Sequence, residues 1–184
     1  MRCEGAERVS FESIVASGKN SALPHATPGF KKIEKGDFVI IDYGAVYGGY
    51  HSDETCTFVV ESVTDRQKEI YSIVKDAHGR ALDSVRAGVA CREVDRIVRD
   101  HIEGAGFGKH FSHGTGHGVG LDVHEAPRLF TKADGSLEAG MVVTIEPGVY
   151  IPDLWGVRIE DMVLVKEDGC EVLTRIPKDL RILG

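Results

Sequence analysis

The chain has 184 residues, of which 42% are hydrophobic and 28% are charged, and this predicts a single globular domain with one substantial hydrophobic core. The net charge of -7 and the lack of any lysine- or arginine-rich run argue against a nucleic-acid partner. No apolar stretch approaches the roughly 20 residues that a membrane-spanning helix needs, so we expect no membrane partner.

Strands dominate the predicted elements. A short strand near residues 13–16 and a loop come first, and two strands joined by a glycine-rich turn follow over 38–60. A glycine- and histidine-rich stretch covers 112–125 without a clear period. A second pair of strands follows over 141–165, and then a turn, a last strand and a tail complete the chain.

Two helices are predicted between the strand pairs. Apolar residues recur at helical spacing over 65–87, where Thr64 is a suitable N-cap and Gly88 ends the pattern. The same spacing predicts a second helix over 92–104.

The four cysteines are scattered and form no C-x-x-C pair. This pattern predicts free thiols in a reducing compartment and not a disulfide framework or a thiolate metal site. We therefore expect a cytoplasmic protein. The cysteines are Cys3, Cys56, Cys91 and Cys170.

An internal repeat links the two strand pairs. "IEKGDFVIIDYG" and "LEAGMVVTIEPG" match at a constant offset, from Ile33 in the first copy and from Leu137 in the second. In each copy the strand ends on an acid, and a turn then leads to a second strand that carries another acid. The repeat predicts a pseudo-twofold that directs four carboxylates to one place. These acids are Asp42, Asp53, Glu146 and Glu160.

Burial makes these carboxylates candidates for chemistry. Asp42 and Glu146 end the nearly continuous apolar runs "VIID" and "VTIE", which predicts that both are buried. A lone acid on a strand is usually solvated, but four acids on paired apolar strands would repel one another. They would need protons, bases or metal ions to neutralise them.

The stretch "SHGTGHGVGLDVHE" supplies three histidines and four glycines. Divalent cations take oxygen ligands and imidazole suits transition metals, so four carboxylates and one histidine could hold two ions that polarise a carbonyl and supply hydroxide. We interpret one histidine as a ligand and two as hydrogen-bond donors to the substrate, and we expect the glycines to let the backbone approach the metals and substrate. The alternative is a surface loop with incidental imidazoles. The histidines are His113, His117 and His124.

Four motifs give the chain a family resemblance. "IDYGAVYGGYHSDETCTF", "HGTGHGVGLDVHEAP", "TIEPGVY" and "GVRIEDMVLV" resemble the ligand motifs of the metal-dependent "pita-bread" peptidases, which include methionine aminopeptidase, aminopeptidase P and prolidase. The resemblance implies an α+β pita-bread fold, in which an internal pseudo-twofold relates the halves of a curved antiparallel sheet covered by helices.

The resemblance also implies a metal centre with five ligands. Asp42 and Asp53 would bind one ion, with Asp53 bridging. His117 and Glu146 would bind the other, and Glu160 would bridge the two. The implied cofactor is a pair of divalent ions, manganese first, with cobalt and zinc as alternatives that ligand chemistry alone does not separate.

Further motifs resemble the proline-directed branch. "VASGKNSALPHATP" is similar to a loop that covers the active site in aminopeptidase P and prolidase, which implies that His25 contacts substrate. "VRIED" and the position of His113 also match this branch. The resemblance implies that His113 and His124 contact the scissile carbonyl or the carboxyl side of the substrate. It also implies that Glu146 transfers the proton, and that Arg158 contacts either a metal-ligand residue or the substrate.

This branch implies a peptidase that cleaves an N-terminal residue from peptides with proline in the second position, as a homodimer. Aminopeptidase P and the Xaa-Pro dipeptidase both remain open. Relatives carry further helices and a further domain before the matching region, so we expect 1–184 to be a C-terminal catalytic domain that lacks them and is weakly active or inactive alone.

Two alternatives belong to other functional classes. One is a non-catalytic pita-bread module that binds peptides or proteins, and the other is a creatinase-like hydrolase of a small C–N substrate. The complete ligand set counts against both. Four further histidines are expected to lie outside the site, namely His51, His78, His101 and His110.

Overall fold

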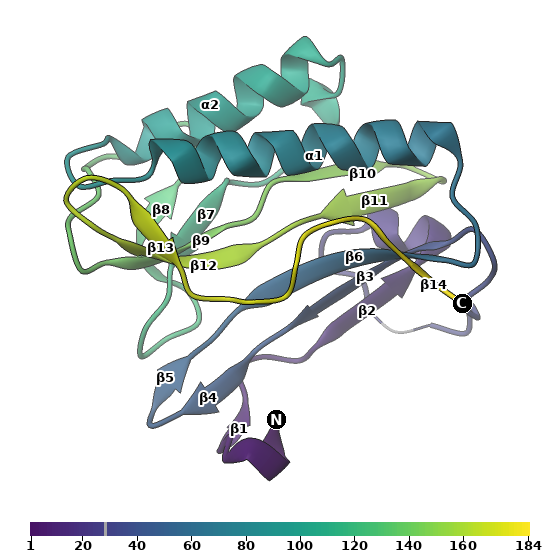
Figure 1. Cartoon of the computed structure of the whole chain (residues 1–184), viewed down its shortest axis with the longest axis horizontal. Helices are drawn as coiled ribbons and strands as arrows, with labels where there is room; N and C mark the ends of the chain where they lie inside the picture. The colour runs from purple at the N-terminus through teal and green to yellow at the C-terminus, as the bar shows by residue number, and fades with distance from the viewer. Residues whose placement is uncertain (28) are drawn as a thin grey trace.

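A computed structural model describes residues 1–27 and 29–184. Two long helices, α1 (Asp65–Ser84) and α2 (Cys91–Gly104), lie side by side over one face of the strands (Figure 1). The described residues also form three short 3-10 helices, which are η1 (Arg2–Glu4), η2 (Gly18–Ala22) and η3 (Gly108–His110). The predicted α+β class is confirmed.

Helix α1 begins where the sequence predicts. The Thr64 hydroxyl accepts a hydrogen bond from the Gln67 N–H at 3.3 Å, and the Gln67 side chain accepts one from the Thr64 N–H at 2.9 Å, which together form a capping box. The helix ends at Ser84, before the predicted limit, because Val85 already has an extended backbone with ψ of 116°.

Hydrogen bonding divides the described strands into four sheets. The first large sheet contains, in order, β14 (Arg181–Leu183), β6 (Glu54–Val60), β3 (Phe38–Tyr43) and β2 (Ile14–Ser17). The second contains, in order, β13 (Cys170–Val172), β12 (Asp161–Val165), β9 (Val142–Ile145), β7 (Gly116–Gly118) and β8 (Glu125–Leu129). The small sheets are β1 (Arg8–Val9) with β4 (Ala45–Tyr47) and β5 (Tyr50–His51), and β10 (Gly148–Ile151) with β11 (Trp155–Arg158).

The predicted repeat is visible in the order of the strands. Strand β3 is followed by the β4–β5 hairpin and then by β6, and β9 is followed in the same way by the β10–β11 hairpin and then by β12. Both β3–β6 and β9–β12 are antiparallel pairs. The two halves of the repeat therefore present their acids at matching strand ends.

The expectation of two simple hairpins was too coarse. The chain leaves each large sheet after the first acid, at Gly44 and at Pro147. A Cβ at Gly44 would lie 1.9 Å from the Ser52 carbonyl oxygen, and proline cannot donate a ladder hydrogen bond. The two large sheets, expected as halves of one sheet, meet through a hydrogen bond from the Glu160 N–H to the Thr55 carbonyl at 3.1 Å.

Strands β7, β8 and β14 are among those that were not predicted in their places. Strands β7 and β8 lie partly or wholly within the glycine–histidine region, and β14 lies in the predicted tail and pairs with β6 in parallel. Glycine-rich sequence carries no apolar alternation, so β7 left no signal of a strand.

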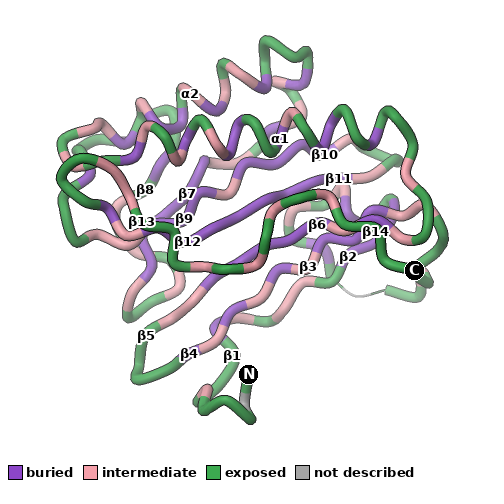
Figure 2. The backbone as a smooth tube through the Cα atoms, in the orientation of Figure 1, coloured by how far each residue is buried: buried purple, intermediate pink, exposed green. Residues whose placement is uncertain are grey.

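The hydrophobic core fills the space between the two helices and the strands. Its fully buried members include Phe38, Ile70, Val98 and Ile145, and the buried segments of Figure 2 follow the inner strands. The Phe38 ring packs edge-on against Trp155 at 5.3 Å between ring centroids. Within the part of the chain that the structure describes, no helix combines the length and apolarity needed to cross a membrane. This core supports the strand ends from which the site is built.

Candidate metal centre and active site

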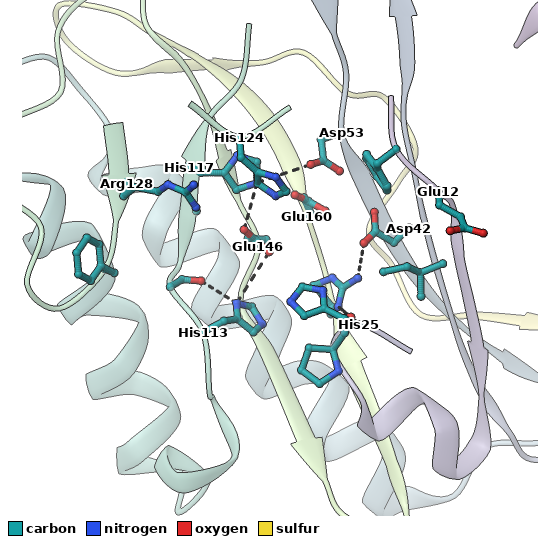
Figure 3. Close-up of a pocket in the computed structure, with 17 residues that line it drawn as sticks. Glu12, His25, Asp42, Asp53, His113, His117, His124, Arg128, Glu146 and Glu160 are labelled. Carbon is teal, nitrogen blue, oxygen red and sulfur yellow. Dashed lines mark hydrogen bonds and ion pairs between the residues drawn. The ribbon is translucent and has the colours of Figure 1, made fainter. Parts of the chain in front are cut away.

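A cavity of about 710 Å³ opens where the ends of β3, β6, β9 and β12 approach one another (Figure 3). The structure brings all nine predicted site residues to its walls. They are His25, Asp42, Asp53, His113, His117, His124, Glu146, Arg158 and Glu160. Pro28, the last residue of the predicted substrate loop, lies outside the described residues.

Strand ends place the four carboxylates. Asp42 lies near the end of β3 and Glu146 directly follows β9, whereas Asp53 and Glu160 directly precede β6 and β12. Apolar residues in these strands pack into the core, so the acids project from rigid elements towards the cavity. The repeat in the sequence thus becomes a convergence of carboxylates in space.

Three of the predicted ligands already lie within the reach of one ion. Ligand atoms of Asp53, His117 and Glu160 lie within 4.8 Å of one another, and all three residues are buried. The His117 Nε2 atom lies 3.7 Å from an Asp53 oxygen and 3.5 Å from a Glu146 oxygen. Glu146 therefore adjoins this group.

The imidazole of His117 is held in the tautomer that a metal ligand needs. Its Nδ1 lies 3.0 Å from the Gly118 carbonyl oxygen, so Nδ1–H donates there and the Nε2 lone pair faces the carboxylates. Burial, with the charges of His124 and Arg128, lowers the pKa of His117 to about 4. The ring is therefore neutral near pH 7.

The carboxylates cannot all be ionised together without a cation. Burial, reinforced by neighbouring carboxylates, raises the pKa of Asp53 to about 10 and that of Glu160 to about 7, and burial raises the pKa of Glu146 well above its usual range. The Asp42 Oδ1 atom is buried and has no hydrogen-bond partner among the described residues. This oxygen-rich, cysteine-free donor set fits a pair of divalent cations.

Arg158 is fixed by the protein itself. Its guanidinium donates to an Asp42 oxygen, to the Tyr150 hydroxyl at 3.0 Å and to the Pro24 carbonyl at 3.1 Å. Its Nε donates to the Thr55 hydroxyl at 3.1 Å. Because Arg158 is only 4% exposed, these contacts hold Asp42 in place across the cavity.

The remaining histidines differ in their freedom. Both nitrogens of His113 are engaged, since Nδ1 lies 2.8 Å from the Gly114 carbonyl and Nε2 lies 2.8 Å from the Tyr150 hydroxyl. His124 is exposed and stacks obliquely on His117 with 4.3 Å between ring centroids. His25 is also exposed at the cavity wall. His124 and His25 are the imidazoles that a bound substrate can reach without breaking these contacts.

The glycines of this region serve the packing of strands more than contacts with metal. A Cβ at Gly116 would lie 1.9 Å from the Thr144 carbonyl oxygen, and one at Gly118 would lie 2.2 Å from the Ala126 carbonyl oxygen. Glycine thus lets β7 lie close to β9 and β8, where we expected it to bring the backbone to the metals and substrate. His117 is held at the centre of this packed region.

The sequence did not predict Tyr150 or Arg128 as parts of the site. Tyr150 on β10 joins His113 to Arg158, and Arg128 on β8 lies opposite His117 in the β7–β8 ladder. Arg128 lines the cavity and forms no ion pair among the described residues. Strand register would have placed Arg128, but β7 and β8 had not been predicted.

The four histidines expected outside the site do not line the cavity. His51 contacts the Ser10 hydroxyl at 2.7 Å, and His110 contacts the Tyr150 carbonyl at 3.1 Å. His78 lies in α1 with its Nε2 3.2 Å from an Asp161 oxygen. These histidines have structural surroundings of their own.

Comparison with known proteins agrees with this geometry. The sequence model of metallopeptidase family M24 matches residues 1–167. The chain belongs to metallopeptidase family M24. The implied pita-bread fold is therefore confirmed, since the structures that this chain resembles are M24 peptidases.

Individual relatives point to the proline-directed branch. The chain is 49% identical to the Xaa-Pro dipeptidase of Pyrococcus furiosus, over 98% of this chain and 52% of the relative. It resembles the structure of an Xaa-Pro dipeptidase from Bacillus anthracis at 52% identity and a TM-score of 0.97, with coverage of 99% of this chain and 51% of that one. An X-Pro aminopeptidase from Thermotoga maritima matches at 43% identity and a TM-score of 0.96, with coverage of 99% and 52%. The chain spans about half the length of these relatives.

Proposed function

We propose that residues 1–184 form the catalytic domain of a dinuclear-metal-dependent peptidase that removes the N-terminal residue from Xaa-Pro substrates. The observation that carries the proposal is the convergence of four carboxylates and the Nε2 atom of His117 on one cavity. Relatives named as Xaa-Pro dipeptidases support the choice of substrate.

The metal pair is proposed to be held by all five predicted ligands. Asp42 and Asp53 would hold one ion, His117 and Glu146 would hold the other, and Glu160 would contribute to both. Manganese is the proposed metal, with cobalt and zinc as alternatives. When bound, such a pair polarises the scissile carbonyl and acidifies a water molecule.

The protein's own side chains supply the remaining steps. Glu146, in the cavity next to His117, takes the proton of the attacking water and delivers it to the departing nitrogen of proline. His124 donates a hydrogen bond to the oxygen on which charge develops. Arg158 and Tyr150 keep Asp42 and His113 in position through the contacts described above.

Arg128 supports a dipeptide as the substrate. Its guanidinium lines the cavity beside His117 and His124, and no carboxylate of the described residues pairs with it. A dipeptide carries its free carboxylate one residue from the scissile bond, where a guanidinium can bind it in bidentate fashion. A longer Xaa-Pro peptide lacks a charge at this position, so the proposal favours a dipeptidase over aminopeptidase P.

The cellular setting is also proposed. All four cysteines are free thiols in the structure, which supports a reducing cytoplasm. The proposed partners are the peptide substrate and a second copy of the chain in a homodimer, and sedimentation of the purified protein tests the dimer.

A peptidase assay tests the activity. With added manganese, we expect residues 1–184 alone to be weakly active, to hydrolyse an Xaa-Pro dipeptide faster than a longer Xaa-Pro peptide, and to leave both Xaa-Ala counterparts intact. The Arg128→Ala variant should raise KM for the dipeptide about tenfold or more, the loss expected for a charge-assisted contact of about 1.5–3 kcal/mol. Lys132→Ala is the matched control, because Lys132 is exposed and does not line the cavity. Equal KM values in the two variants would rule out the role of Arg128.

A further inference from the structure

A second group of charges lies behind the metal ligands. The ammonium of Lys178 lies 2.5 Å from a Glu54 oxygen, 3.3 Å from an Asp161 oxygen and 3.5 Å from the Cys56 sulfur. The lysine side chain is 9% exposed, and its three N–H donors match these three neighbours. None of these four residues lines the catalytic cavity, so the mechanism above does not use them.

The two carboxylates of this group are sequence neighbours of the bridging ligands. Glu54 follows Asp53 at the start of β6, and Asp161 follows Glu160 at the start of β12. Because successive side chains of a strand point to opposite faces, each pair directs one acid to the cavity and the other away from it. Lys178 therefore joins, from behind, the two strand ends that carry the bridging ligands.

These strand ends belong to different sheets, and the Asp53 N–H also joins them by donating to the Met162 sulfur at 3.0 Å. Strand β6 lies in the first large sheet and β12 in the second. The Glu160 N–H donates to the Thr55 carbonyl at 3.1 Å, and the Thr55 hydroxyl donates to a Glu160 oxygen at 2.6 Å. The position of β6 relative to β12 sets the distance between Asp53 and Glu160.

The segment that carries Lys178 is itself anchored at several points. The Leu173 N–H donates to the Met162 carbonyl at 2.9 Å, and the Tyr71 hydroxyl donates to the Lys178 carbonyl at 3.2 Å. Lys75 of α1 pairs with Asp179 at 2.5 Å. These contacts fix the backbone on both sides of the ammonium.

The acids are also oriented from their other sides. The Tyr43 hydroxyl donates to the second Glu54 oxygen at 3.1 Å, and the Thr174 hydroxyl donates to Asp161. Without Lys178, two oriented and buried carboxylates would face each other without a cation between them. Their repulsion would act directly on the starts of β6 and β12.

We propose that Lys178 is a positioning residue for the metal centre. By holding Glu54 and Asp161 together, it sets the separation of Asp53 and Glu160 and thereby the affinity for the divalent cation between them. The inference rests on the proposed function. Lys178 lies beyond residues 1–167, which the family model matches, so the role belongs to the segment that follows them.

Manganese binding measured by calorimetry tests the proposal. We expect Lys178→Met to weaken Mn²⁺ binding about tenfold, the lower end of the about 10–100-fold seen when a direct contact to a metal ligand is lost, and to lower kcat with KM changed less than about twofold. Lys178→Arg should retain most of the affinity. Lys68→Met is the matched control, because it removes an exposed ion pair of α1 with Asp65 and should leave Mn²⁺ affinity unchanged.

A second variant separates positioning from folding. Glu54→Gln combined with Lys178→Met removes one of the two facing carboxylates and thereby their mutual repulsion, so the double variant should unfold at nearly the wild-type denaturant midpoint and still bind Mn²⁺ more weakly. Wild-type affinity in either Lys178→Met protein would overturn the role of Lys178. A failure of the proposed function gives a different result. If that function is wrong, the wild-type protein itself will bind no Mn²⁺ or will leave Xaa-Pro peptides intact.

Discussion

Replacing Asp53 with asparagine should stabilise the metal-free protein at neutral pH while it removes binding of divalent cations. Burial and the nearby Glu160, Asp42 and Glu146 raise the pKa of Asp53 to about 10 in the metal-free fold. In an unfolded chain the pKa of an aspartate is about 3.9. At every pH between these two values, the folded metal-free site therefore holds a proton that the unfolded chain has released.

The sign and size of the effect follow from this difference. A group whose pKa is raised in the folded state contributes most to the free energy of unfolding below its unfolded pKa. This contribution declines as the pH rises towards the folded pKa. Each pH unit in this window lowers the free energy of unfolding by about 1.4 kcal/mol. From pH 5 to pH 8 the Asp53 carboxyl thus lowers the free energy of unfolding by about 4 kcal/mol. Asparagine does not titrate, so the variant lacks this decrease.

Urea unfolding with chelator at pH 5 and pH 8 measures this difference. Between the two pH values, the free energy of unfolding of the metal-free wild type should fall by about 4 kcal/mol more than that of Asp53→Asn. Asp168→Asn, at an exposed site, is the control and should follow the wild type. Manganese at about 100 times its Kd should then stabilise the wild type by about 2.7 kcal/mol and leave Asp53→Asn unchanged. Parallel pH profiles for wild type and Asp53→Asn would refute the reasoning.

Four further predictions concern the metals, the histidines, the helix cap and the glycines. Chelation should abolish peptidase activity and manganese or cobalt should restore it, so full activity in a metal-free preparation would contradict the mechanism. His117→Ala should lose metal affinity together with turnover, whereas His124→Ala should keep its metal and lose about 10²–10³-fold in kcat. Equal loss of metal affinity in the two variants, measured by calorimetry, would show that the histidine ligand is misassigned. Thr64→Ala should lower the free energy of unfolding by about 1 kcal/mol without changing metal affinity, because it removes the cap of α1. Gly116→Ala places a Cβ 1.9 Å from a carbonyl oxygen of β9 and should lower the free energy of unfolding, measured in urea, by more than about 3 kcal/mol. Gly169→Ala is the control and should change it little, because the space around Gly169 is open.

The sequence by itself determined the elements whose signals are local. Helix α1 begins at its predicted cap because Thr64 and Gln67 satisfy each other's backbone groups within one turn. The repeated strand-and-acid pattern placed four carboxylates at matching strand ends, since apolar runs fix which segments are buried and where they stop. The family motifs added His117 to this set.

Only the tertiary structure decided which side chains complete the site. Strand β7 is held by glycines that fit between neighbouring backbones, and such packing leaves no periodic pattern in the sequence. Without the β7–β8 register, nothing placed Arg128 opposite His117. The break of each hairpin after its acid likewise depends on a close backbone contact at Gly44 and on Pro147.

Long-range charge pairs show the same division most clearly. Arg158 meets Asp42 across 116 residues of sequence, and Lys178 meets Glu54 across 124. A buried cation is stable only where a folded chain brings carboxylates around it, and that condition is a property of the whole fold. Local sequence therefore determined which groups were available for chemistry, and packing between distant segments determined which groups hold them in position.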